Sequence, residues 1–179
     1  MFSKILSRIL GQTRQSDVDL SSTWLTRAPK MQRGLLQVSK DFQNLKPPAD
    51  YSYDMFAAKM ALERNKRFEA TLGDGRIEDW VGIRIEKRTH PSGDTSLSIM
   101  ISDLGDSVFV GNSHVDDPIR IDSAMFDVVA RTKVRTPVIF SGQLVAGTSG
   151  SMHMPDVYEK YSELKGLIFA IRFDHIRLL

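Results

Sequence analysis

A change of hydrophobic period at Gly75 constrains the fold of this chain more than any other feature. Before this glycine apolar residues recur at helical spacing, and after it they alternate every second residue, as in strands with one buried face. The segment IEDWVGIRIEKRTH (77–90) shows the alternation first. It predicts a strand that buries Val81, Ile83 and Ile85 and exposes the residues between them, Gly82, Arg84 and Glu86.

Four further strands and one helix follow from the same reasoning. HPSGD (90–94) predicts a turn into a second strand, TSLSIMISD (95–103), and SVFVGN (107–112) predicts a third. Asp122 or Ser123 caps a predicted helix that runs to about Thr132. TPVIFSGQLVAG (136–147) predicts a fourth strand, a loop follows over 148–163, and a fifth strand begins near Lys165. The predicted order is β-β-β-α-β-β.

This order is that of the OB-fold, a small, partly open Greek-key barrel. Strands of so small a barrel coil sharply, and Gly82 and Gly142 are predicted to be the structural glycines that bend the first and fourth strands. Over residues 77–179 the chain resembles OB-fold proteins, and among them small uncharacterised bacterial proteins with an OB-like barrel. The resemblance is one of pattern and is carried by WVGIRIE, SLSIMISD, VFVG, IFSGQLV and LIFAIRFDHI. The expected class is α+β.

Two regions precede the predicted barrel (76–179). Residues 15–75 are expected to be helical, with a helix at about 52–70, a stop at Pro47-Pro48 and an end at Gly73 and Gly75. Residues 1–14 form an amphipathic basic segment that fits a membrane or partner anchor, an organelle presequence, or a helix docked on the chain's own core. The anchor residues are Phe2, Lys4, Ile5, Leu6, Arg8, Ile9 and Leu10.

Composition excludes several functional classes. The chain has no cysteine, which excludes disulfides, cysteine-ligated metals and thiol nucleophiles. The formal net charge is only +2, from 24 basic and 22 acidic residues, so no strong overall field draws the chain to polyanions. No apolar stretch approaches the roughly 20 residues that a membrane-spanning helix needs. The expected location is the cytoplasm, with peripheral membrane contact as an alternative, or an organelle in a eukaryotic source.

A binding face for nucleic acid or a partner is predicted on the barrel. OB-folds bind single strands with a basic groove and aromatic side chains on which bases stack. Here alternation places Phe109 opposite Val108 and Val110, where it is expected to be exposed. The candidate residues are Arg84, Lys87, Arg88, Phe109 and Arg172. The simpler interpretation is that Arg84 and Glu86 pair with Arg172 and Asp174 across neighbouring strands.

Catalytic signals are weak, and no catalytic residue, metal ligand or cofactor is predicted. His114, Asp116 and Asp117 together suggest a metal-dependent hydrolase, but a solvated turn explains them more simply. Met152, His153 and Met154 suggest a soft-metal or partner contact only remotely. The sequence therefore favours a non-catalytic OB-fold binding or assembly module with a protein partner. Single-stranded nucleic-acid binding is the alternative.

Overall fold

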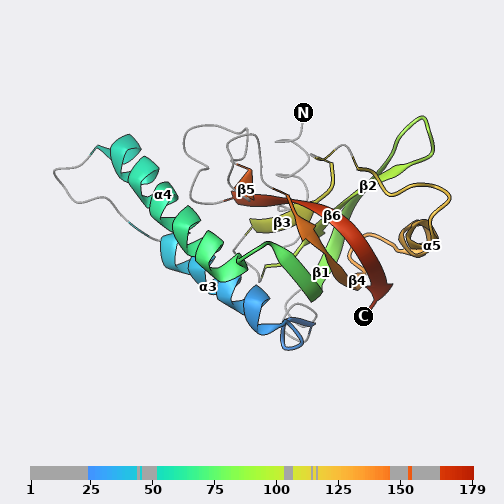
Figure 1. The fold of residues 1–179 in the computed structure, drawn as a ribbon, viewed down its shortest axis with the longest axis horizontal. Coiled ribbons are helices and arrows are strands. Elements are labelled where there is room, and N and C mark those ends of the chain that lie inside the picture. Colours follow the sequence, from blue (N-terminus) through green and yellow to red (C-terminus); the bar gives the residue numbers. More distant parts are fainter. Residues whose placement is uncertain are drawn as a thin grey trace.

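A computed structural model describes residues 24–43, 45, 52–102, 107–113, 115, 117–145, 153–154 and 166–179. The described residues form an α+β fold with a closed five-stranded mixed β-barrel and the helices α3, α4 and α5 (Figure 1). The helical pair α3 (Lys30–Gln43) and α4 (Tyr53–Leu72) lies on one side of the barrel, and α5 (Ala124–Arg131) lies on the opposite side.

Five strands close the barrel through both antiparallel and parallel pairing. β1 (Arg76–Thr89) pairs antiparallel with β2 (Thr95–Met100), which pairs antiparallel with β3 (Ser107–Gly111). β3 runs parallel to β6 (Gly166–Leu178), and β4 (Pro137–Leu144) lies antiparallel between β6 and β1. A two-residue strand, β5 (His153–Met154), pairs with β6 inside the segment predicted to be a loop. That part of the loop prediction is wrong.

The prediction that Gly82 and Arg84 of β1 face solvent is wrong. Arg84 lies opposite Ile99, a core residue, so Gly82 and Arg84 are on the inner face together with Trp80. Val81 is also buried, because Trp24 and Ala28 cover the outer face of the strand. Both faces of β1 are therefore covered, and a bulge between Arg84 and Glu86 then shifts the alternation.

Gly82 allows β2 to approach β1 closely. A Cβ atom there would lie 2.8 Å from the Met100 carbonyl oxygen and would overlap the Ile99 side chain. The irregularities of β1 fall elsewhere, between Ile77 and Trp80 and between Arg84 and Glu86. The position therefore requires a glycine, and the predicted bend of β1 at Gly82 stays a prediction.

The irregularity of β4 falls at the predicted Ser141-Gly142 pair. The register of β4 on β6 shifts between these two residues, and a Cβ on Gly142 would overlap the Arg172 carbonyl oxygen. On the other edge of β4, Asp79 adopts a positive φ of 50° in the β1 bulge and donates its N–H to Ser141 Oγ at 2.9 Å. The extra residues lie in the two neighbours of β4, Asp174 in β6 and one residue between Ile77 and Trp80 in β1, and these bulges give the sharp coiling that a small barrel needs.

Helices α3 and α4 share the core of the barrel. Leu35 and Leu36 of α3 join Phe68 and Leu72 of α4 in the cluster that fills the barrel, and Phe68 packs edge-on against Phe169 of β6 at 5.5 Å. The helix predicted at 52–70 is thus present as α4, which ends at Gly73 with a φ of 58°.

The buried Gln32 side chain attaches α3 to β1. Its amide nitrogen donates to the Val81 carbonyl oxygen at 2.6 Å, and its amide oxygen accepts the Val81 N–H at 2.9 Å. The same nitrogen lies 3.4 Å from the Ile101 carbonyl oxygen. Gln32 therefore serves as a hydrogen-bonding neighbour for β1 just beyond the point where its pairing with β2 ends.

Ser123 begins α5, as the sequence predicted. Its hydroxyl accepts the Phe126 N–H at 3.2 Å and donates to the Arg120 carbonyl oxygen at 2.7 Å, while Val129 is buried in the barrel core. We expect Ser123→Ala to lower the free energy of unfolding by about 1 kcal/mol, measured by urea denaturation. Ser52→Ala is the comparison and should cost less, because Ser52 Oγ is 3.4 Å from the Met55 N–H. Equal costs would contradict this account of the α5 cap.

Candidate functional site

Arg84, predicted to be exposed on a binding face, is 5% exposed and holds a turn. Its Nε donates to the Lys133 carbonyl oxygen at 2.9 Å, and burial lowers the pKa of the guanidinium. Backbone bonds join the same segments, because the Arg84 N–H donates to Thr136 and the Arg84 carbonyl accepts the Arg135 N–H at 2.7 Å. The predicted exposure of Arg84 is therefore wrong, since the residue lies on the inner face of β1.

Phe109 is also buried, with 8% of its surface exposed. Alternation does turn it away from the core residues Val108 and Val110. However, the register places Met100 of β2 on one side of Phe109 and Ile168 of β6 on the other. The ring is thus part of an apolar row on the outer face. The prediction that Phe109 is exposed is wrong.

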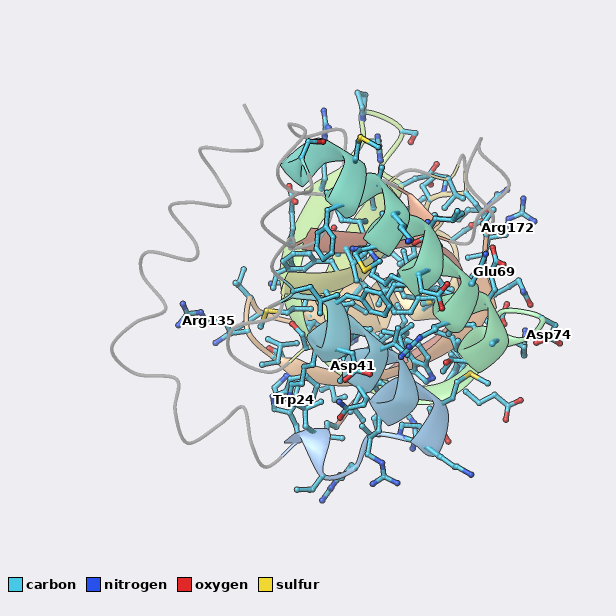
Figure 2. All side chains as sticks on the ribbon, turned by 90° about the vertical axis from the view of Figure 1, so that its left-hand side faces the viewer. Trp24, Asp41, Glu69, Asp74, Arg135 and Arg172 are labelled. Atoms are coloured by element: carbon cyan, nitrogen blue, oxygen red, sulfur yellow. The ribbon has the colours of Figure 1, made fainter. Side chains whose placement is uncertain are left out.

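The remaining candidates do not share one face. Lys87 and Arg88 are exposed at the end of β1, where Lys87 Nζ lies 3.4 Å from the Ala130 carbonyl oxygen of α5. Arg172 pairs instead with Asp117, with 3.7 Å between Nε and the carboxylate. Figure 2 shows Arg172 at the opposite edge of the molecule from Arg135, the residue bonded to Arg84.

The predicted charge pairs between β1 and β6 have other members. β4 lies between these strands, and the ion pairs that cross it join Arg76 to Asp174 and Asp79 to Arg177. These two ion pairs lie on either side of Ser141 along β4. Arg84 and Glu86 form no ion pair with any other residue that the structure describes.

Several sequence predictions lie outside the described residues. These are the anchor residues Phe2, Lys4, Ile5, Leu6, Arg8, Ile9 and Leu10, and His114 and Asp116 of the hydrolase hypothesis. Asp117 is described, and it is exposed and paired with Arg172. Within the described ranges no group of three or more His, Asp or Glu side chains is placed to hold a metal ion. None of the helices in those ranges has the length and apolar character to cross a bilayer.

In a small pocket beside the start of α5, the polar side chains Asn112 and Arg120 are bonded to other groups of the protein. It is lined by Asn112, Asp117, Pro118, Ile119, Arg120, Ser123, Met125 and Phe173. The Asn112 amide accepts the Leu97 N–H at 2.7 Å and donates to the Asp117 carbonyl at 3.2 Å, and Arg120 is paired with Asp122. These bonds hold the loop before α5.

A basic turn that the sequence analysis missed follows α5. Lys133, Val134 and Arg135 are exposed in the turn between α5 and β4, with Arg131 in the last turn of the helix and Lys87 beside it. We call Lys87, Arg131, Lys133, Val134 and Arg135 the basic turn. Its signal in the sequence was the run RTKVR (131–135), in which three cations lie within five residues.

A second missed surface lies on α4, away from the barrel. Met55, Lys59, Leu62 and Lys66 fall on one narrow stripe of this helix, opposite the buried Arg64 and Phe68. Met55 is 68% exposed and Leu62 is 59% exposed. We call these four residues the α4 stripe.

Comparisons of the chain with protein-family models, with curated proteins and with solved structures find no match.

Proposed function

We propose that the chain is a non-catalytic binding or assembly module built on an OB-like barrel. The order of strands around the barrel, β1-β2-β3-β6-β4, supports this proposal, as does the parallel pairing of β3 with β6. The position of α5 between β3 and β4 is the helix position of the OB-fold. The proposed location is the cytoplasm, with residues 1–14 as a peripheral attachment.

The observation that carries the binding role is the α4 stripe on a helix held firmly to the barrel. Gln32 and the shared core fix the α3–α4 pair, so the stripe is presented in one orientation. Met55 and Leu62 are large apolar side chains at i and i+7 that face solvent. Burying such side chains against a partner contributes roughly 1.5–3 kcal/mol each.

The charges of the α4 stripe define the partner as a protein with an acidic, apolar surface. Lys59 and Lys66 alternate with the two apolar residues along the helix. The carboxylate of Glu63 beside the stripe is engaged by Arg67 at 3.9 Å, and the stripe carries its two positive charges before Glu69, which follows one turn after Lys66. An acidic amphipathic helix matches both its charge and its spacing.

Single-stranded nucleic-acid binding has less support. That function requires cations and stacking aromatics on a common face. Arg84 and Phe109 are buried. Arg172 lies opposite Gln143 near one end of β4, whereas β1 continues to Lys87 and Arg88 from Ile83, which lies opposite Pro137 at the other end.

Capture of a partner from the source organism, followed by measured binding to the purified partner, tests the proposed function. We expect the Met55→Asp/Leu62→Asp variant to weaken binding of the identified protein at least tenfold in calorimetry, because two apolar contacts are lost and two opposing charges are added. Val134→Asp is the matched control at the other end of the barrel and should bind normally. Unchanged binding by the α4 variant would contradict the proposal, as would dimerisation through the stripe in sedimentation analysis.

A further inference from the structure

Four segments meet at the end of the barrel where α5 lies. β6 finishes there, β4 begins there, β1 ends its pairing with β4 there at Ile83, and the turn 132–136 joins α5 to β4 (Figure 1). Arg84 Nε holds the Lys133 carbonyl at 2.9 Å, and the Leu179 N–H donates to the Pro137 carbonyl at 3.2 Å. The basic turn and the end of β6 therefore form one surface with a fixed shape.

This surface concentrates positive charge. Lys87, Arg131, Lys133 and Arg135 are all exposed, whereas the whole chain has a formal net charge of only +2. Among the described residues, no carboxylate forms an ion pair with Lys87, Arg131 or Lys133. Among the described residues, the acidic ones adjacent in sequence to these cations are Asp127, one helical turn before Arg131, and Glu86, next to Lys87.

Capping of α5 accounts for only part of this charge. Cations are favourable at a helix C-terminus, and Lys87 and Arg131 lie at the carbonyl end of α5. Lys133 and Arg135 lie beyond the helix, in a turn that Arg135 enters with a positive φ of 67°. Their side chains are exposed on either side of Val134, and Figure 2 shows Arg135 directed away from the body of the protein.

The exposed apolar residues of this surface are aliphatic. Val134 is 60% exposed at the turn, and Leu178, which pairs with Val138 at the start of β4, is 56% exposed. Single-stranded nucleic acids are bound by aromatic stacking, whereas aliphatic residues flanked by cations suit the boundary between lipid headgroups and acyl chains.

We propose that the basic turn and Leu178 form a contact for an anionic lipid membrane. Lys133 and Arg131 pair with lipid phosphates, while Val134 and Leu178 enter the interfacial region between them. Arg84 is a positioning residue, because its buried guanidinium holds the carbonyl of Lys133 and fixes the direction of the turn. This inference is independent of the partner proposed for the α4 stripe.

Vesicle co-sedimentation of the full chain tests this contact. The wild type should bind vesicles of phosphatidylcholine with phosphatidylglycerol, and should bind pure phosphatidylcholine at least tenfold more weakly. Lys133→Glu/Arg135→Glu should weaken binding to the anionic vesicles at least tenfold, and so should Val134→Asp. Lys133→Arg should retain the affinity. The Lys59→Glu/Lys66→Glu variant makes the same charge change on α4 and should remain within about threefold of wild type, because exposed charges are screened over about 10 Å.

Three outcomes would overturn the membrane contact. Absence of binding to anionic vesicles is the first, and equal loss in the α4 charge variant is the second, because it would show a response to total charge alone. The third is binding of a single-stranded oligonucleotide that the Lys133→Glu/Arg135→Glu change abolishes while vesicle binding persists. Thermal melting of each variant separates these results from unfolding. Vesicle binding by Met55→Asp/Leu62→Asp keeps the membrane contact distinct from the partner site.

Discussion

The Gly142→Val variant is expected to lose more than about 3 kcal/mol of stability. The reason is the close approach of β4 and β6, because a Cβ at position 142 would overlap the carbonyl oxygen of Arg172 and lie 3.1 Å from its carbonyl carbon. Both obstacles are backbone atoms, so no change of rotamer relieves them. Valine also adds two methyl groups, one of which would meet Ile171, already 3.1 Å from that Cβ.

Gly142→Ala and Gly73→Ala provide the comparison that isolates the overlap. Gly73 has nothing within 4 Å of a Cβ, so alanine there should cost only what its backbone conformation (φ 58°, ψ −117°) imposes, about 1–3 kcal/mol. Gly142→Ala should cost clearly more in thermal and urea unfolding, with a fall in melting temperature of about 10 °C or more. Equal costs at the two positions would show that β4 and β6 can separate without penalty.

The second large effect is expected from Gln32→Leu, which should cost about 2–4 kcal/mol. Leucine nearly preserves the volume of glutamine but leaves the Val81 N–H without its acceptor and the Val81 carbonyl without its donor. Both backbone groups are in the interior, where water does not replace the lost bonds. The cost therefore measures the attachment of α3 to the barrel.

Gln37→Leu is the matched control, because Gln37 lies on the same helix and makes only an exposed bond to Asp41. It should change the free energy of unfolding by less than about 0.5 kcal/mol in urea denaturation. Gln32→Glu adds a second comparison, because it keeps the acceptor for Val81 N–H while placing a carboxylate against the Val81 carbonyl. At neutral pH it should be at least as destabilising as Gln32→Leu. A small cost for both Gln32 variants would mean that packing alone attaches α3.

Features that depend on adjacent residues could be predicted from the sequence, whereas contacts between residues far apart in the chain could not. Gly142 could be identified because a small residue interrupts an apolar run, and Ser123 because its position before an apolar helix is typical of a cap. Gln32 could not be identified, since its partner Val81 is 49 residues away. Alternation also failed at Arg84, because the inner and outer faces of β1 are both covered and bulges interrupt the pattern.

The candidate binding face also could not be predicted where it depends on contacts between distant strands. Lys87 and Arg88 were correctly expected at the surface. Phe109 was placed on the outer face by its alternation with Val108 and Val110, but periodicity gives no information on the neighbours that bury it. Grouping Arg172 with Arg84 required knowledge of strand order, and β4 separates their strands. The basic turn was visible as RTKVR, but the position of Lys87 beside it depends on the tertiary fold.

The position of β6 has a consequence for synthesis of the protein. This last strand pairs with β3, β4 and β5, and its Phe169 packs against Phe68 of α4, about a hundred residues earlier. A nascent chain that lacks residues 166–178 therefore leaves strand edges of β3 and β4 open and the apolar side of α4 incomplete. The native barrel therefore forms only after β6 has been translated, and until then the edges of β3 and β4 are open to pairing with other chains.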